Sequence, residues 1–356
     1  MSVFSRLDVA GHEQVTFCHD RTLGLHAIIA IHSTVLGPAI GGTRFRRYPS
    51  DDDALEDVLR LSRAMTYKSA VAGLNLGGGK AVVLGDPGTD KSDALLRSYA
   101  EFVDRLGGRY LTAEDVGTTQ TDMDLIREVT PFVTGASEAQ GGSGDPSPAT
   151  AYGLLHAMRA TAQHVWGNAA LEGRHVAIAG AGKVGSHLAR HLLEAGARLT
   201  VADVDGAAVE RVVGLDPARV DVAPPATVHT TACDIYSPCA LGGALNEVTI
   251  PELRTAAVVG AANNQLADAA AAAQLAHAGV LYAPDYVVNA GGVINLAEEL
   301  VGYDRPRAWR RIEGIFDTTT AVFRKAEAER ITTAAAADRM AEERLDRRGA
   351  ADQPPS

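Results

Sequence analysis

The sequence lacks an excess of positive charge, a long apolar run and an apolar leader. Its 356 residues carry a formal net charge of −11 at pH 7, which argues against a nucleic-acid partner or an anionic membrane surface. No apolar run is long enough to span a bilayer, and the opening residues MSVFSRLD contain no apolar export core. We therefore expect a cytoplasmic protein with no nucleic-acid partner and no membrane partner.

Cysteine is scarce, and no metal-binding pattern is present. The three cysteines, Cys18, Cys233 and Cys239, do not have the spacing of metal ligands, so we expect reduced, packed thiols. Glu13 follows a histidine but lacks the second histidine of a zinc-binding helix. The sequence therefore predicts no metal site.

What is present is ordinary globular composition and one informative segment, residues 175–203. The chain is 46% hydrophobic and 22% charged, and its length suggests two domains. In the segment a short apolar run ends at the turn GAGKVG, and an amphipathic helix and a second apolar run follow. This order is that of a dinucleotide-binding β-α-β unit, a stronger signal than the glycine pattern alone.

The residue types in this unit suit a diphosphate and a ribose. Gly180 permits a tight turn, Gly182 lets the backbone approach a diphosphate, and Gly185 lets the helix pack against the strand. Asp203 lies 18 residues beyond Gly185, where an acid holds ribose hydroxyls and repels a 2′-phosphate. We therefore predict NAD rather than NADP as the cofactor. The predicted contacts are Gly180, Gly182, Lys183, Val184, Gly185 and Asp203.

The first part of the chain predicts an α/β domain. Two β-rich runs, 14–18 and 25–32, are expected to form an antiparallel pair, whereas segment 36–44 is too glycine-rich for a regular element. A long helix is expected from Ser50, its N-cap, to about Ala72. Further expected elements are a strand at 81–85 after a glycine-rich loop at 73–79, a helix at 91–106, a strand at 110–113 and a helix starting near Thr119.

The second part begins at a predicted hinge, the Gly-, Ser- and Pro-rich segment 135–148. The alanine-rich run 267–278 is expected to be helical, because alanine is the best helix former. Other expected elements are helices at 149–164 and near 206–213, strand-like runs ending at 233–239, 258–264 and 280–284, and a charged helical tail from Arg305.

Lys80 is the most informative single residue. It follows three glycines, but a phosphate-binding loop needs glycine where Leu74 stands and serine or threonine where Ala81 stands, so that motif is rejected. A lysine packed among bare backbone is desolvated, which lowers its pKa and makes it a usable base. A lone lysine at a strand start is more often a surface residue. Lys68, in the apolar last turn of the preceding helix, favours the functional interpretation, because two close ammoniums also bind a carboxylate.

Three polar residues follow strand-like runs. Asp115 is a candidate catalytic acid, but a helix-capping or turn role is about equally compatible with its spacing. Asn263 and Asn289 each end an apolar run, where ligands gather in open α/β sheets. An Asx-turn is the alternative for both asparagines.

The sequence contains six informative motifs, in this order: Thr66–Lys68, Gly73–Lys80, Thr112–Thr118, Pro146–Tyr152, Ala283–Gly292 and Ala337–Glu343. Together they resemble the glutamate/leucine/phenylalanine/valine dehydrogenase family, most closely its leucine and valine members. The resemblance covers residues 12–344 in the same order. It implies an α/β fold in which an N-terminal substrate domain with a mixed sheet faces a Rossmann-type NAD-binding domain across a cleft.

The resemblance implies domain boundaries and residue roles. Residues 1–140 would form a substrate and oligomerisation domain, 141–325 the NAD-binding domain, and 326–356 a helix that returns toward the first domain and a frayed tail. Lys80 would activate the attacking water and Asp115 would carry protons to and from the amino group. Lys68, with Gly41, Gly42 and Met65, would bind the substrate, and Asn263 would fix both substrate and nicotinamide. Thr150, Cys239, Ala240 and Asn289 would complete the cofactor site.

The implied reaction is the oxidation of an L-amino acid by NAD⁺ to a 2-oxo acid and ammonia, and its reverse. Glutamate-specific relatives have a lysine at the position of Ile40 and a serine at that of Leu296. Here both are apolar, and Ala113 and Val293 would complete the wall, so an aliphatic side chain is expected. Leucine-type relatives have valine at the position of Leu296, so the smaller pocket favours valine over leucine. One methylene is worth only ~1–3 kcal/mol, so overlapping activity is expected.

Two alternatives remain open. A phenylalanine or broad-range dehydrogenase would need more room near Ile40, Ala113 and Leu296. A catalytically inactive NAD-binding regulatory protein would not need Lys68, Lys80 and Asp115, which are all present. Relatives are homo-oligomers, dimers or octamers, and we expect the N-terminal strands and the C-terminal helix to make the contacts.

Overall fold

The computed structural model describes residues 3–351, which divide into two compact units. Unit 1 comprises residues 3–145, 296–305 and 341–351, and unit 2 comprises 146–295 and 306–340. The chain first passes from unit 1 to unit 2 between Asp145 and Pro146. None of the helices described within 3–351 is both long and apolar enough to cross a membrane.

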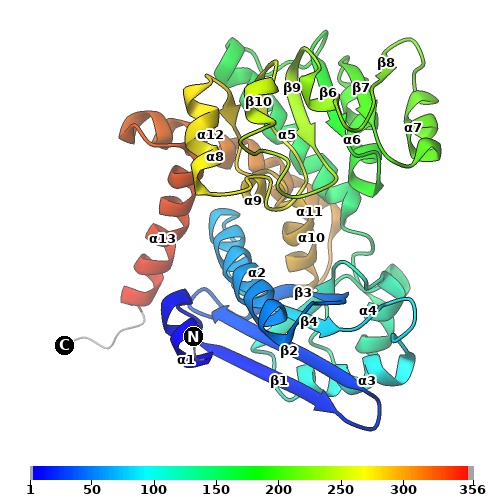
Figure 1. Cartoon of the computed structure of the whole chain (residues 1–356). Coiled ribbons are helices and arrows are strands. Elements are labelled where there is room, and N and C mark those ends of the chain that lie inside the picture. Colours follow the sequence, from blue (N-terminus) through cyan, green and yellow to red (C-terminus); the bar gives the residue numbers. More distant parts are fainter. Residues whose placement is uncertain (1–2, 352–356) are drawn as a thin grey trace. The chain divides into compact units, whose positions relative to one another are not determined.

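Unit 1 is built on a mixed five-stranded sheet with the order β1-β2-β4-β3-β5 (Figure 1). The predicted pair β1 and β2 is antiparallel, as is β2 with β4, whereas β3 runs parallel to β4 and to β5. The mixed sheet expected for the N-terminal domain is therefore confirmed. The strands are β1 (Gln14–Asp20), β2 (Leu25–Ser33), β3 (Ala39–Arg46), β4 (Gly77–Leu84) and β5 (Tyr110–Glu114).

The prediction that segment 36–44 is irregular is wrong, because β3 occupies most of it and lies inside the sheet. The glycines there are required by close backbone contacts. A Cβ on Gly41 would lie 1.8 Å from the carbonyl oxygen of Gly79, and one on Gly42 would lie 2.5 Å from that of Glu114. The low strand propensity of glycine therefore gave the wrong prediction for this segment. Glycine is required here because the neighbouring backbone leaves no room for a Cβ.

The predicted start of the β4 strand is also too late in the sequence. The strand begins at Gly77 rather than at Ala81, so three glycines expected in a loop belong to the sheet. A Cβ on Gly78 would lie 2.0 Å from the backbone nitrogen of Thr66, in the helix that crosses this strand. Helix and strand backbones can approach this closely only where the strand carries no side chain.

Helices cover both faces of this sheet. On one face α2 packs on Ile28, Ala30 and Val82, and on the other face α3 and α4 pack around Tyr99 and Tyr110. Ser50 accepts a hydrogen bond from the amide of Asp53 and caps α2, which confirms the predicted helix start. The helices are α1 (Val3–Ala10), α2 (Asp51–Val71), α3 (Asp93–Asp104) and α4 (Gln120–Arg127).

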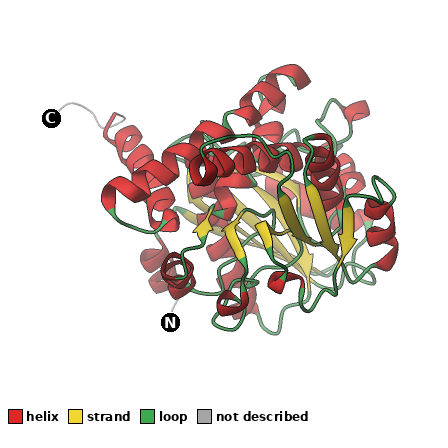
Figure 2. Cartoon of the chain, turned by 90° about the horizontal axis from the view of Figure 1, so that it is seen from above, coloured by secondary structure: helices red, strands yellow, loops and turns green. Residues whose placement is uncertain are grey.

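Unit 2 is built on a parallel six-stranded sheet with the order β11-β10-β9-β6-β7-β8, with helices packed beside its strands (Figure 2). Numbered from β6, this order is 6-5-4-1-2-3, that of the Rossmann dinucleotide-binding fold, which confirms the predicted fold class. The sequence pattern did not indicate β8. The strands are β6 (His175–Ala179), β7 (Arg198–Ala202), β8 (Val220–Val222), β9 (Cys233–Pro238), β10 (Thr255–Val258) and β11 (Leu281–Tyr282).

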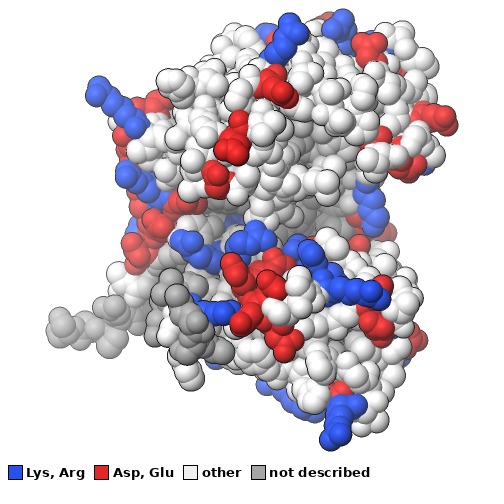
Figure 3. Space-filling view, viewed as in Figure 1, with Lys and Arg blue, Asp and Glu red and all other residues white. Residues whose placement is uncertain are grey.

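The alanine-rich run is helical as predicted, and Asp268 caps it through two backbone amides. The remaining helices are α5 (Ser147–Trp166), α6 (Lys183–Glu194), α7 (Gly206–Val213), α8 (Ala269–His277), α9 (Asp285–Val288), α10 (Gly291–Glu299), α11 (Arg305–Glu313), α12 (Ile315–Glu329) and α13 (Thr333–Ala351). Three short 3₁₀ helices are η1 (Glu138–Gln140), η2 (Val228–Thr230) and η3 (Ile250–Glu252). The three cysteines are free thiols; Cys18 is buried, whereas Cys233 and Cys239 are half-buried. Acidic and basic side chains are intermixed on the face shown in Figure 3.

The close contact of α2 with β4 predicts that a side chain at Gly78 lowers the thermal stability of the protein. Gly78→Ala is expected to lower the melting temperature strongly, since its Cβ would lie 2.0 Å from the Thr66 nitrogen and neither backbone can yield without moving an element. Gly206→Ala is the matched control, because its added Cβ has no atom of the described part of the chain within 4 Å. Differential scanning fluorimetry of both variants tests this, and equal melting temperatures would contradict it.

Candidate active site and cofactor site

Strand register brings four predicted substrate-side residues of unit 1 onto one face of the sheet. Ile40 pairs with Leu111 and Gly42 with Ala113, and residues paired in neighbouring strands share a face. Ile40 also pairs with Gly78, two residues before Lys80 in β4, so Lys80 lies on the same face. This is the face that α2 covers.

The helix on this face carries two further predicted residues. Met65 and Lys68 belong to the C-terminal half of α2, where Thr66 approaches the backbone of Gly78. Both side chains are half-buried, and Lys68 interacts with other groups of the protein. The close approach of the Lys68 and Lys80 ammoniums stays a prediction.

Lys80 is buried and bonded to Asp115. Its Nζ lies 2.7 Å from Asp115 Oδ2, and the residue is only 7% exposed. Asp115 directly follows β5 and reaches Lys80 across the intervening β3. The alternative of a surface lysine is therefore wrong, and the expectation that Lys80 is packed inside the protein is confirmed.

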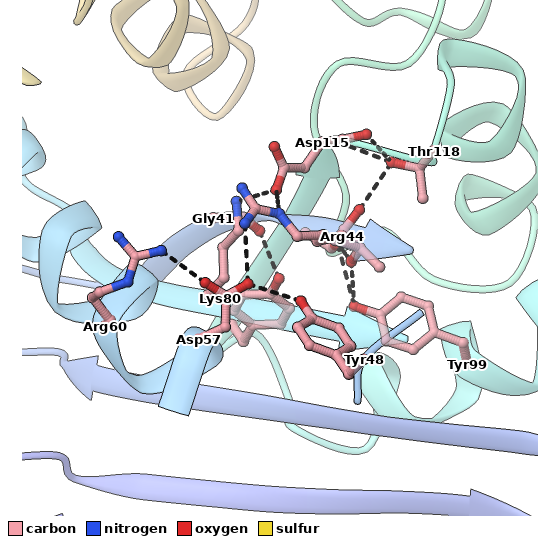
Figure 4. A network of polar contacts seen from close by, with 12 residues as sticks. Gly41, Arg44, Tyr48, Asp57, Arg60, Lys80, Tyr99, Asp115 and Thr118 are labelled. Carbon is pink, nitrogen blue, oxygen red and sulfur yellow. Dashed lines mark hydrogen bonds and ion pairs between the residues drawn. The ribbon is translucent and has the colours of Figure 1, made fainter. Parts of the chain in front are cut away.

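A second cation on Asp115, Arg44, was missed. Arg44 Nε lies 3.0 Å from the same Oδ2, and in Figure 4 the three side chains point toward one another. Arg44 lies four residues after Ile40 in β3 and so on the same face. The alternation of Ile40, Gly42 and Arg44 is the signal that could have identified it, had the glycine-rich segment been interpreted as a strand.

These cations set the charge of Asp115. Burial acts to raise the pKa of this carboxyl, but the charges of Lys80 and Arg44, with hydrogen bonds from Lys80 and the Val116 amide, lower the pKa to about 2. Asp115 is therefore an anion at neutral pH, which is the form that a proton acceptor must have.

Hydrogen bonds through Thr118 fix the turn that carries Asp115. The Asp115 amide donates to Thr118 Oγ1, which donates to the carbonyl oxygen of Thr43, with both distances 2.9 Å. The next helix, α4, is capped by Thr119 in a capping box with Asp122. The helix-capping alternative for Asp115 is therefore wrong.

The four predicted pocket-wall residues fall in both units. Ile40 and Ala113 are buried together on the α2 face of unit 1. Leu296, also in unit 1, is half-buried and has its Cδ2 3.3 Å from the position of a Cβ on Gly135. Val293 is buried in unit 2. Their joint role in one pocket stays a prediction.

In unit 2 the glycine turn joins β6 to α6 as predicted. Gly180 has a φ of 116°, and a Cβ on Gly185 would lie 1.9 Å from the Gly180 carbonyl oxygen. Among the residues described, 3–351, no atom lies within 4 Å of the position of a Cβ on Gly182, the N-cap of α6, so the backbone is open to a ligand at the helix start. Lys183 is exposed and Val184 half-buried beside it.

Asp203 and the residues that follow β9, Cys239 and Ala240, contact the glycine turn. Asp203 Oδ2 accepts a hydrogen bond of 2.6 Å from the Ala181 amide, so the carboxylate is tied to the glycine turn. A Cβ on Gly180 would lie 2.8 Å from Ala240 and 3.0 Å from Cys239. Because β6 lies between β7 and β9, these residues gather at the point where the strand order reverses, which is the dinucleotide site of this fold.

The two asparagines predicted for the cofactor site, Asn263 and Asn289, are bonded to each other in unit 2. Asn289 Nδ2 donates to Asn263 Oδ1 at 2.9 Å and to the Ala261 carbonyl oxygen at 3.0 Å, so an Asx-turn does not describe Asn289. Its buried Oδ1 has no hydrogen-bond partner within residues 3–351. An unpaired buried acceptor fits the carboxamide NH₂ of a nicotinamide.

Thr150 lies against the start of α10. Its Oγ1 donates to the Pro146 carbonyl oxygen at 3.0 Å and lies 2.7 Å from the position of a Cβ on Gly292. A Cβ on Gly291 would lie 2.1 Å from the Ala149 carbonyl oxygen, so the two glycines let α5 and α10 pack backbone to backbone.

The lowered pKa of Asp115 predicts a pH dependence of stability. Its ionised form stabilises the fold fully above the ordinary pKa of 3.8, and this contribution is lost as the pH falls through about 2. The pKa difference corresponds to about 2 kcal/mol. Asp115→Asn should therefore lower the melting temperature at neutral pH, and the gap from the unmodified protein should narrow on acidification below about pH 4. Asp93→Asn, at an exposed position, is the control. A gap that stays constant with pH would contradict the prediction.

Comparisons with known proteins agree with this geometry. Residues 12–131 match the family model of the Glu/Leu/Phe/Val dehydrogenase dimerisation domain, and residues 141–222 and 210–345 match that of Glutamate/Leucine/Phenylalanine/Valine dehydrogenase. A leucine dehydrogenase of Geobacillus stearothermophilus is 52% identical over 347 residues, which cover 97% of this chain and 94% of that protein. A valine dehydrogenase of Streptomyces virginiae is 52% identical over 339 residues, 95% of each chain. The solved L-tryptophan dehydrogenase from Nostoc punctiforme has a TM-score of 0.85 and 42% identity, covering 98% of this chain and all 100% of that one. The chain therefore belongs to the Glu/Leu/Phe/Val dehydrogenase family.

Proposed function

We propose that this protein is an NAD-dependent L-amino-acid dehydrogenase that oxidises branched-chain amino acids to 2-oxo acids and ammonia, and catalyses the reverse reaction. The observation that carries the proposal is the ion pair of the buried Lys80 with Asp115, on the sheet face that also holds Ile40 and Ala113. Relatives named leucine and valine dehydrogenase, each 52% identical to this chain, support the substrate class.

The residues of unit 1 carry the proton transfers. Asp115, an anion at neutral pH, takes a proton from the substrate ammonium and returns one to the leaving ammonia. Lys80, in its neutral form, removes a proton from the water that attacks the imine carbon. Lys68 and the backbone of Gly41 and Gly42 hold the substrate carboxylate, which orients the α-carbon.

The residues of unit 2 hold the cofactor. A Rossmann sheet in a dehydrogenase family indicates a nicotinamide cofactor, and bound NAD⁺ supplies the hydride acceptor. The open backbone at Gly182 receives the diphosphate, while Asp203 accepts from the ribose and disfavours a 2′-phosphate. Asn289 and Asn263 orient the carboxamide through the unpaired Oδ1 of Asn289.

The substrate pocket discriminates more strongly by the charge of the substrate side chain than by its size. Ile40 and Ala113 are buried apolar residues, and we place Leu296 and Val293 in the same wall. A wall without a cation excludes a side-chain carboxylate, because an unpaired buried charge is very costly. Leu296 reduces the volume and favours valine over leucine by at most the ~1–3 kcal/mol that one methylene supplies.

The active protein is proposed to be a cytoplasmic homo-oligomer. The family model over residues 12–131 is described as a dimerisation domain. In unit 1, β1 is an edge strand of the sheet, and Phe17 on it is 56% exposed. Such an edge offers unpaired backbone groups to a second copy. Free thiols at all three cysteines agree with a reducing compartment.

Parallel assays of reductive amination test the function. At saturating ammonia, NADH loss should be fastest with 3-methyl-2-oxobutanoate, close behind with 4-methyl-2-oxopentanoate, and slow with phenylpyruvate and 2-oxoglutarate. The physical reason is the apolar, uncharged wall at Ile40 and Ala113. Fastest turnover of 2-oxoglutarate would refute the pocket argument, and fastest turnover of phenylpyruvate would establish the broad-range alternative.

Replacement of the base separates chemistry from cofactor binding. Lys80→Ala should keep NADH affinity within about threefold, because Lys80 belongs to unit 1, and should lower turnover by the ~10²–10⁴-fold typical of a lost general base. NADH fluorescence titration and steady-state rates measure the two effects. Arg97→Ala, which removes one cation from an exposed ion pair with Glu128, is the control. Near-native turnover of Lys80→Ala would show that Lys80 is not the base.

A further inference from the structure

Arg44 is a buried cation with no task in the proton transfers described above. Its Nε and Lys80 Nζ contact the same oxygen of Asp115, at 3.0 Å and 2.7 Å. The side chain of Arg44 is only 13% exposed. Burial of a guanidinium carries a large desolvation cost, so the fold retains it only where its bonds are nearly all made.

The other end of Arg44 is bonded to α2. Its Nη1 lies 3.0 Å from Asp57 Oδ2, and the Tyr48 hydroxyl donates to that oxygen at 2.8 Å. Arg60 Nη2 lies 2.8 Å from the second oxygen of Asp57. Burial acts to raise the pKa of Asp57, but the Tyr48 hydrogen bond and the charge of Arg44 lower it, so Asp57 is an anion. Figure 4 shows this continuous path from Arg60 to Asp115.

This arrangement suits an arginine and not a lysine. The planar guanidinium presents Nε and Nη1 in fixed directions, so bonds to two carboxylates determine both its plane and the orientation of each acid. Arg44 in β3 therefore connects α2, which carries Lys68, to the residue that follows β5. A lysine at this position offers one nitrogen, which cannot satisfy both acids in the same geometry.

We propose that Arg44 is a positioning residue for Asp115, with Asp57 as its anchor; this inference rests on the proposed dehydrogenase function. Arg44 holds Asp115 Oδ2 toward Lys80 and carries a charge that does not vary with pH. When Lys80 gives up its proton to act as the base, Asp115 retains one cation. Its orientation and its negative charge are thereby kept through the catalytic cycle.

The test compares Arg44→Gln and Arg44→Lys with the unmodified enzyme. In Arg44→Gln, kcat for the branched-chain 2-oxo acid should fall about 10–100-fold while KM changes less than about threefold, as expected for a residue that orients a catalytic group. The acid limb of kcat should move to higher pH, since removal of a fixed cation makes proton binding by the Lys80–Asp115 pair more favourable. Arg44→Lys should also lose about tenfold or more in kcat but keep the acid limb.

Arg46→Gln is the matched control, because Arg46 lies two residues further along the same strand and is exposed. Its kcat and pH profile should be unchanged. A folded Arg44→Gln enzyme with unmodified kcat and an unmoved acid limb would overturn the proposal. If Arg44→Gln does not fold, Arg44→Lys decides, and full activity of that variant would equally overturn it.

A crystal structure of the variant separates this inference from the proposed function. Asp115 should be turned away from Lys80 in Arg44→Gln, or in Arg44→Lys if only that variant folds, whether or not the enzyme is active. If the unmodified protein turns over no 2-oxo acid, the proposed function fails, and the Asp115 position alone decides the inference. An unchanged Asp115 position with lost activity would overturn positioning by Arg44.

Discussion

The candidate active site of unit 1 depends on the bond between the buried ammonium of Lys80 and the half-buried carboxylate of Asp115. Each charge alone would cost several kcal/mol to remove from water, so each is tolerated only because the other is present. Arg44 and Asp57 extend this pairing to α2. Stability and chemistry therefore share the same bonds, and a change in any member leaves a neighbouring charge without its partner.

The parts of the fold that local patterns determine could be predicted from the sequence. Ser50 caps a long amphipathic helix, and the run at 175–203 contains strand, turn, helix and strand within one continuous segment. Segment 36–44 could not be interpreted correctly in this way. Its glycines are required by contacts with Gly79 and Glu114, residues distant in sequence, and propensity counts the same glycines as breakers.

The residues of the candidate site likewise fall into two groups, those that local sequence identifies and those that only the folded structure reveals. Lys80, before an apolar run, and Asp115, after one, could be identified as candidates from the sequence, and the glycine turn could be predicted because its spacing is informative. Arg44 and Asp57 were missed, since nothing in their local sequence distinguishes a buried arginine–carboxylate bond from a surface charge. The unpaired Oδ1 of Asn289 likewise depends on a contact with Ala261, which only the folded sheet brings about.

Strand register fixes two of the four residues proposed for the pocket wall, Ile40 and Ala113, whereas Val293 and Leu296 belong to α10. Ile40 and Ala113 share a face with Lys80 because β3 lies between β4 and β5, so their positions relative to the base cannot shift without a slip of the sheet. Discrimination against a charged substrate uses the cost of an unpaired buried charge, which exceeds the ~1–3 kcal/mol available from one methylene. Exclusion of acidic amino acids should therefore tolerate most single changes in the wall. The ranking of valine and leucine rests on the smaller term, and one substitution at Leu296 is sufficient to reverse it.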